Sequence, residues 1–182
     1  MNDVAAIVAT AFAGLVFIKA KDANAMVIKP GTRPARLTNN DVRALIASNN
    51  NLLGSPFGDG QFLNERDVLR IAYIESGLDY TAFRYEPKLG TASYGLMQIL
   101  ENTARDIGFN GPVENLYNPS TNIYYGMKYL VWINQYLIRK LGYSPTKNQL
   151  LSAYNAGVGN VLRGYISTAY LAKFAISSTM FA

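Results

Sequence analysis

The 182-residue chain contains no cysteine and no histidine. The absence of cysteine excludes disulfides, thiolate metal sites and thiol nucleophiles. The absence of histidine excludes Ser-His-Asp triads, Cys-His dyads and HExxH zinc sites together. Any acid–base chemistry must therefore be carried by Asp, Glu, Lys or Tyr side chains.

The chain also lacks a strong charge of either sign on its main part. Its net charge is +5, of which +3 falls in residues 1–36, so that residues 37–182 carry only +2. A nucleic-acid-binding module usually has a basic stripe on a folded face, and this sequence has no such pattern. We therefore expect no nucleic-acid partner. The length and the 49% apolar content suit one domain with a sizeable core.

One long uncharged run, from Val4 to Ile18, is short for a membrane span. Its fifteen residues would reach ~22 Å as a helix, against ~30 Å for a hydrocarbon core. One interpretation is a signal peptide, because Ala23 to Ala25 resembles a cleavage site. We favour a membrane anchor, extended by tilt or by snorkelling of Lys19 and Lys21. A third interpretation is a helix packed on the domain or on a partner protein.

Composition divides the chain into three parts. Residues 1–18 form a hydrophobic N-terminal segment, residues 19–37 a basic linker, and residues 38–182 the folded domain. Capping residues and glycines predict helices over 38–48, 64–77, 102–107, 118–141, 144–154, 158–163 and 167–180. Residues 78–93 look irregular, and no run alternates as a half-buried strand would. The predicted fold class is mainly α, with an N-terminal hydrophobic helix before the domain.

Glu75 is the first candidate for chemistry. It follows largely apolar residues at the end of the predicted helix 64–77. Burial and the negative end of the helix dipole would both raise the pKa of its carboxyl toward the range of a general acid. The simpler interpretation is a solvated glutamate at a helix end, and its position alone favours that interpretation.

Two further segments carry polar groups among small residues. In Ser93 to Ile99, Gly95 permits a close backbone approach, and Gln98 offers a donor and an acceptor to a sugar. In Ala153 to Gly157, the Tyr154 phenol could hydrogen-bond the Glu75 carboxyl. Taken alone, the first segment is better explained as a buried turn with one satisfied amide. The second can be an ordinary helix end, with Asn155 capping and Gly157 in the left-handed conformation.

The order and spacing of these segments resemble the SLT-type lytic transglycosylases, a lysozyme-like family that cleaves peptidoglycan glycan strands. The resemblance covers roughly residues 60–175. It rests on Glu75-Ser76, on Ser93 with Gly95 to Ile99, on Asn102 to Ala104, on Leu116 to Leu130 (LYNPSTNIYYGMKYL), and on Ala153 to Gly157 (AYNAG). It implies a lysozyme-like helical domain with a substrate cleft.

The resemblance also implies roles for single residues. Glu75 matches the catalytic glutamate, and the substrate-binding positions are Ser93, Gly95, Met97, Gln98, Tyr154, Asn155 and, by a looser alignment, Tyr170. Phe83 to Gly90 looks longer than in many members, so we expect it to form a wall or lid over the cleft. Leu100 stands where members often carry methionine.

The implied reaction uses one carboxyl group and needs no metal and no cofactor. Glu75 protonates the glycosidic oxygen between N-acetylmuramic acid and N-acetylglucosamine, and then takes the proton of the C6 hydroxyl, which leaves a 1,6-anhydromuramyl end. One alternative is a muramidase with a second acid, for which Asp79, Glu86 and Glu101 are nearest in sequence and Glu86 is favoured. Another is a non-catalytic peptidoglycan-binding assembly protein.

The expected partners are peptidoglycan strands, a membrane through residues 4–18, and proteins of a phage particle or a secretion apparatus. We expect a membrane-associated protein whose catalytic domain acts in the periplasm or cell wall, with a virion component as the alternative. Lys19 and Lys21 follow the apolar run, so the positive-inside rule would keep the domain cytoplasmic. A cytoplasmic domain would not reach a cell-wall substrate. A releasable signal, or a place in a virus particle, would remove that conflict.

Overall fold

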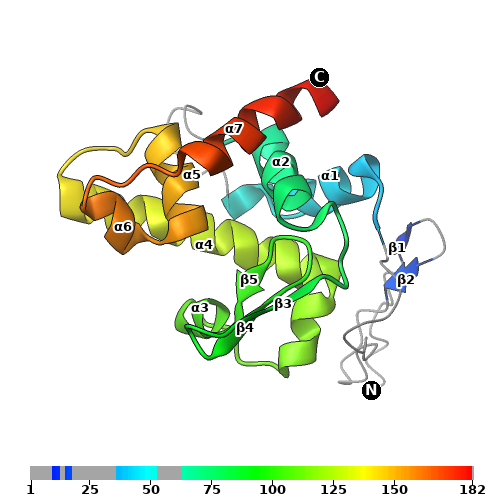
Figure 1. The fold of residues 1–182 in the computed structure, drawn as a ribbon. Coiled ribbons are helices and arrows are strands. Elements are labelled where there is room, and N and C mark those ends of the chain that lie inside the picture. The colour runs from blue at the N-terminus through cyan, green and yellow to red at the C-terminus, as the bar shows by residue number, and fades with distance from the viewer. Residues whose placement is uncertain (1–9, 13–14, 18–35, 53–62, 182) are drawn as a thin grey trace, which may run out of the picture.

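The computed structural model describes residues 10–12, 15–17, 36–52 and 63–181. The helices are α1 (Asn39–Ala47), α2 (Glu65–Ser76), α3 (Glu101–Asp106), α4 (Pro119–Leu141), α5 (Lys147–Ala156), α6 (Val158–Leu162) and α7 (Thr168–Ser177), with the 3-10 turns η1 (Asn50–Leu52), η2 (Val113–Tyr117) and η3 (Ser178–Met180). The strands are β1 (Thr10–Phe12), β2 (Leu15–Phe17), β3 (Phe83–Glu86), β4 (Thr91–Tyr94) and β5 (Ile99–Leu100) (Figure 1). The domain is mainly helical, as predicted.

The N-terminal hydrophobic helix expected over residues 1–18 is wrong for the part that is described. Thr10–Phe12 and Leu15–Phe17 pair as antiparallel strands, with Thr10 opposite Phe17. β-Branched and aromatic residues such as Val16 and Phe17 favour this extended pairing. Residues 18–35, including the suggested cleavage site, lie outside the described residues. No helix within the described ranges is long and apolar enough to cross a membrane.

Local capping explains why most predicted helix boundaries are confirmed. Thr38 and Asp41 form a capping box at the start of α1, and Asn64 and Asp67 form another at the start of α2. Gly77, with φ 62°, ends α2 in the left-handed conformation. α5 starts later than Ser144-Pro145 suggested, because a capping box from Thr146 to Gln149 sets its first turn.

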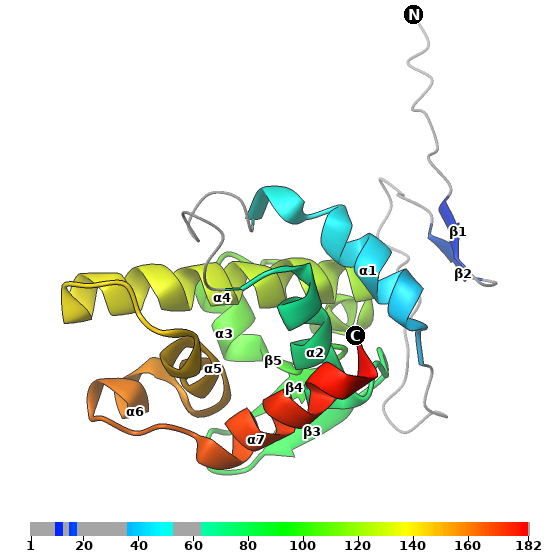
Figure 2. The same cartoon turned by 90° about the horizontal axis from the view of Figure 1, so that it is seen from above.

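The long helix α4 is the centre of the domain. Asn118 caps it by accepting hydrogen bonds from the backbone N–H groups of Ser120 and Thr121. Figure 2 shows α4 running the length of the domain, with the sheet and α3 toward its N-terminal half and α5 and α6 toward its C-terminal half. Its fully buried apolar residues recur at helical spacing and are Ile123, Met127, Leu130, Ile133 and Leu137.

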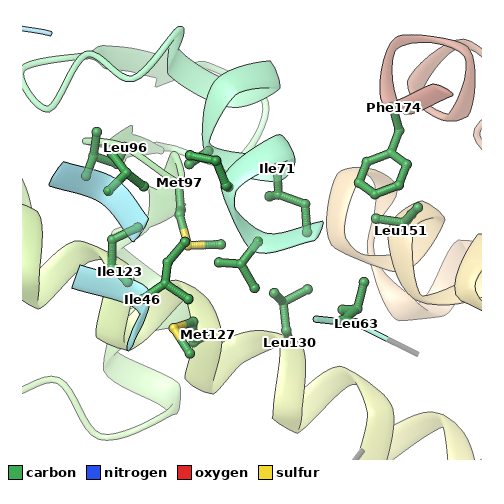
Figure 3. Close-up of a cluster of buried hydrophobic side chains, with 14 of the residues drawn as sticks. Ile46, Leu63, Ile71, Leu96, Met97, Ile123, Met127, Leu130, Leu151 and Phe174 are labelled. Carbon is green, nitrogen blue, oxygen red and sulfur yellow. The ribbon is translucent and has the colours of Figure 1, made fainter. Parts of the chain in front are cut away.

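The main core lies where α4 meets α1, α2 and the turn after β4. Figure 3 shows Ile123, Met127 and Leu130 of α4 beside Ile46 of α1 and Ile71 of α2. Leu96 and Met97 enter the same core from the turn and are fully buried.

The prediction of irregular structure over residues 78–93 is wrong. β3 and β4 form an antiparallel hairpin in which Phe83 lies opposite Tyr94 and Glu86 opposite Thr91, and β5 pairs with β4. Three of the four β3 residues are exposed and the fourth is half-buried, whereas Thr91 to Ser93 are all buried. Neither strand therefore carries the apolar–polar alternation by which strands are recognised.

The Asn122 side chain joins the sheet to α4. Its Oδ1 accepts from the Met97 N–H at 2.7 Å, and its Nδ2 donates to the carbonyls of Tyr94 and Leu116, each at 2.7 Å. Gly95 has φ +68°, and a Cβ at this position would lie 2.5 Å from Asn122 Nδ2. Only glycine lets the turn lie this close to the amide.

We expect Asn122→Ala to lower the free energy of unfolding by about 3 kcal/mol or more, because it leaves buried backbone groups without partners. Urea denaturation followed by circular dichroism measures the change. Asn102→Ala, at an exposed position on α3, is the matched control and should stay within about 0.5 kcal/mol of the native protein. Equal stabilities for the two variants would contradict the role assigned to Asn122.

Candidate active site

Glu75 lies in the last turn of α2, where the helix end is tied to the turn after β4. The Ser76 hydroxyl donates to the Leu96 carbonyl at 2.8 Å and to the Ala72 carbonyl at 3.1 Å. Gly77 then ends the helix. This anchoring fixes the Cα of Glu75 beside the segment that follows β4.

Burial raises the pKa of the Glu75 carboxyl above its ordinary value, and this is the largest effect on it. Three groups act in the opposite direction and lower that pKa: the Tyr170 hydroxyl, which donates to Glu75 Oε1 at 2.8 Å, and the charges of Arg84 and Lys173. Desolvation prevails, so the raised pKa expected from the sequence is confirmed. A carboxyl in this state can hold a proton nearer neutral pH and donate it.

Two tyrosines expected near the carboxyl have different hydrogen-bond partners. Tyr170 of α7 reaches Glu75 directly. The Tyr154 hydroxyl, considered above as a partner of Glu75, donates instead to the Met97 carbonyl at 2.7 Å. Burial raises the pKa of both phenols well above 10, so both remain hydrogen-bond donors.

The residues of the Ser93–Ile99 segment mainly build the turn. Ser93 is buried in β4, and Met97 has no exposed surface and packs against Gly126 of α4. Gln98 adopts a left-handed φ of 45°, and its Nε2 donates to the carbonyls of Gly95 (3.0 Å) and Ala82 (3.2 Å). Gly95 approaches Asn122 rather than an open surface. The Met97 side chain thus belongs to the core.

Asn155 is exposed at the end of α5 and supports the loop before α7. Its Oδ1 accepts from the Ser167 hydroxyl at 2.8 Å, and the Ser167 N–H donates to the buried Ser152 hydroxyl at 3.0 Å. These contacts set the start of the helix that carries Tyr170. Asn155 therefore supports the start of α7 and has a structural partner of its own.

Sequence reasoning did not identify Arg84 and Lys173. Arg84 lies on β3, inside the extended Phe83–Gly90 segment that was expected to wall the cleft. Lys173 lies one helical turn after Tyr170 on α7, so the spacing could have placed it on the same face. Both positive charges act on the Glu75 carboxyl.

Each carboxylate considered as a second acid has another partner. Asp79 accepts from the Thr81 N–H (2.9 Å) and hydroxyl (2.7 Å). Glu86 pairs with Arg84 at 2.5 Å, and Glu101 pairs with Arg105 at 3.1 Å. Among the described residues, no other carboxylate is a cause of the pKa shift of Glu75. The same part of the chain contains no cluster of three or more acidic residues that could hold a metal ion.

Glu75 is thus a half-buried acid at a helix end, and its carboxyl accepts a hydrogen bond from the Tyr170 hydroxyl. Residues 60–175 match the model of the Transglycosylase SLT domain, and the chain belongs to that family. The identification made from the ordered motifs is therefore confirmed.

Several curated relatives are named membrane-bound lytic murein transglycosylase C. The protein from Haemophilus influenzae (strain PittEE) is 33% identical over 124 residues, which cover 63% of this chain and 33% of the relative. That from Mannheimia succiniciproducens is 35% identical over 114 residues, 58% of this chain and 30% of the relative. The chain thus spans about a third of the length of these relatives.

Solved structures of lytic transglycosylases also resemble the chain. An inactive mutant of Slt from Pseudomonas aeruginosa matches with a TM-score of 0.49 and 20% identity, over 72% of this chain and 20% of that one. The 70-kDa soluble lytic transglycosylase from Escherichia coli matches with a TM-score of 0.44 and 26% identity, over 75% of this chain and 18% of that one.

We expect Tyr170→Phe to raise the pKa of Glu75 further, because the lost hydrogen bond favours the charged carboxylate. A carbon-13 NMR titration of side-chain carboxyl groups measures this directly. Tyr165→Phe, at an exposed tyrosine before α7, is the control and should leave the titration unchanged. A fall in the pKa of Glu75 in Tyr170→Phe would show that the phenol acts in the opposite way.

Glu75→Gln should stabilise the fold at neutral pH more than at acidic pH. The folded-state pKa of Glu75 is raised, so the native protein binds this proton more tightly than the unfolded chain. Its stability therefore falls as pH rises from the unfolded-state pKa through the folded-state pKa, and stays lower above it. Glutamine removes this titration and can still accept from Tyr170.

Thermal unfolding across this pH range measures the difference in Tm between Glu75→Gln and the native protein. Glu114→Gln, at an exposed position on η2, controls for the general effect of removing one carboxylate. A difference for Glu75→Gln that does not grow as pH rises would contradict the burial of a charged Glu75.

Proposed function

We propose that the chain is a lytic transglycosylase that cleaves the β-1,4 bond between N-acetylmuramic acid and N-acetylglucosamine, with Glu75 as its single acid and base. The observation that carries this proposal is the half-buried Glu75 carboxyl, whose pKa is raised by desolvation and whose perturbing charges, among the described residues, are cations only. Membership of the SLT family and the names of its murein transglycosylase relatives support it.

In the first step, the protonated Glu75 donates to the glycosidic oxygen as the bond from that oxygen to C1 of the muramic acid breaks. Its raised pKa keeps the proton available at a pH where an ordinary glutamate would be ionised. The 2-acetamido group of the same sugar supports the positive charge that develops at C1. The leaving N-acetylglucosamine receives the proton on its O4.

In the second step, the Glu75 carboxylate takes the proton of the C6 hydroxyl while that oxygen bonds to C1. The product is a 1,6-anhydromuramyl end, no water is consumed, and Glu75 is protonated again. The carboxylate form of Glu75 needs stabilisation in a partly desolvated site, and the Tyr170 hydroxyl with the charges of Arg84 and Lys173 can provide it.

For substrate binding we retain Ser93, Gln98, Tyr154, Asn155 and Tyr170 as proposed contacts. Tyr154 and Gln98 would act chiefly by holding the turn against which a sugar lies, since the Tyr154 hydroxyl and the Gln98 amide donate to backbone carbonyls. For Gly95 and Met97, which are both buried, we propose a supporting role in positioning that turn.

We infer a cell-envelope setting for the enzyme. Relatives are named membrane-bound, and the basic residues that follow the uncharged run from Val4 to Ile18 would suit an anionic surface. A membrane contact through residues 4–18, and a partner in a phage particle or secretion apparatus, are proposals that rest on this sequence. Each would localise wall cleavage.

Digestion of purified peptidoglycan by the full chain tests the reaction, with the products analysed by mass spectrometry. The expected product has 1,6-anhydromuramyl ends, and Glu75→Gln should reduce its formation at least about a hundredfold, the usual contribution of a general acid. The matched control is Glu86→Gln on β3, which should retain activity. If the native chain instead produces reducing muramic ends, and Glu86→Gln no longer does, the reaction is hydrolysis with Glu86 as the second carboxylate. Binding without cleavage would favour the assembly-protein alternative.

A further inference from the structure

Three aromatic side chains stack on one face of α4, near the candidate site. The rings of Tyr129 and Trp132 have centroids 5.8 Å apart and planes 21° apart, and those of Trp132 and Tyr136 are 5.0 Å and 20° apart. Spacings of three and four residues place all three on the same side of the helix. We refer to Tyr129, Trp132 and Tyr136 as the aromatic column.

The aromatic column is partly open to solvent. All three residues are half-buried, whereas Ile133 and Leu137 on the neighbouring face are fully buried. Centroid separations of this size at a small interplanar angle are typical of offset stacking, which leaves part of each ring face uncovered by the next ring. The column therefore offers apolar ring surface along about 10 Å of helix.

The column is continuous with the Glu75 site. The Tyr129 ring lies 5.5 Å from the Tyr154 ring, and Tyr154 donates to the Met97 carbonyl. Tyr154 is also near enough to Glu75 for the two groups to interact electrostatically. From that end, the column leads along α4 toward its C-terminus.

Positive charges lie beside the column. The Lys140 ammonium and the Arg139 guanidinium lie 5.8 Å and 6.0 Å from the Tyr136 ring centroid. Apolar ring surface flanked by cations matches a ligand that has apolar C–H faces and carries carboxylates.

We propose that the aromatic column is a glycan-binding subsite, which holds sugars of the peptidoglycan strand that lie beyond the pair being cleaved. Pyranose rings would place their C–H faces on the open parts of the rings, and muramyl or peptide carboxylates would lie near Arg139 and Lys140. This proposal rests on the proposed function for the identity of the ligand. A partner protein is the competing occupant.

The chain's single tryptophan, Trp132, makes the column observable by intrinsic fluorescence. Full-length Glu75→Gln is titrated with soluble glycan strands from which the peptides have been removed, so that no cleavage occurs. We expect a saturable change in emission. Tyr136→Ala in the same background should weaken binding about three- to tenfold, and Tyr136→Phe should restore it.

Tyr143→Ala is the matched control, because Tyr143 is exposed just beyond α4 and outside the column. It should bind strands as the parent does. Thermal denaturation of each variant separates a binding loss from a folding loss. Equal affinities for Tyr136→Ala and Tyr143→Ala, or emission unchanged by glycan, would overturn the proposal and favour a protein occupant.

Activity measurements keep the two proposals distinguishable. In the otherwise native enzyme, Tyr136→Ala should raise KM for long strands and leave KM for the shortest cleavable oligosaccharide unchanged. If the native chain cleaves peptidoglycan but the Trp132 emission of Glu75→Gln does not change on addition of glycan strands, the subsite proposal alone would be rejected. A glycan-dependent Trp132 signal without any cleavage by the native chain would reject the proposed function alone.

Discussion

The arrangement around Glu75 depends on one buried amide, that of Asn122. By binding the Met97 N–H and the carbonyls of Tyr94 and Leu116, it fixes the turn between β4 and β5 on α4. The same turn presents the carbonyls of Leu96 and Met97 as acceptors. One takes the Ser76 hydroxyl at the end of α2, and the other takes the Tyr154 hydroxyl near the end of α5. Three helices are thereby aligned around a single carboxyl.

The pKa of Glu75 is set by opposing effects, since desolvation raises it and nearby donors and cations lower it. The proposed reaction needs both. Burial alone would favour a permanently protonated acid, whereas a solvated glutamate would be permanently ionised at neutral pH. Tyr170, Arg84 and Lys173 come from α7 and from the β3 hairpin, and each favours the anion. A group that first donates and then accepts a proton requires that neither form be favoured too strongly.

The parts of the fold that follow local rules could be predicted from the sequence. Thr38, Asn64 and Asn118 cap helices through hydrogen bonds to residues two or three positions away, so their signals are contained in short segments. The β3–β4 hairpin could not be found in this way, because its outer strand is almost fully exposed and its inner strand is buried on successive residues. Tertiary context, rather than alternation, determines those strands.

The same distinction applies to the candidate site. Glu75 could be found because it stands in an ordered set of motifs, and its raised pKa could be expected from an apolar helix end. The resemblance placed Tyr170 at the site only as a substrate-binding residue. Its hydrogen bond to Glu75 and the role of Lys173 could not be deduced, because both residues are nearly a hundred positions away and meet Glu75 only through the packing of α7 on α2. Short motifs identify a reactive group, but long-range packing determines which neighbours tune it. The Tyr154 hydroxyl shows the consequence, since its motif is intact and yet its partner is a backbone carbonyl that positions the turn.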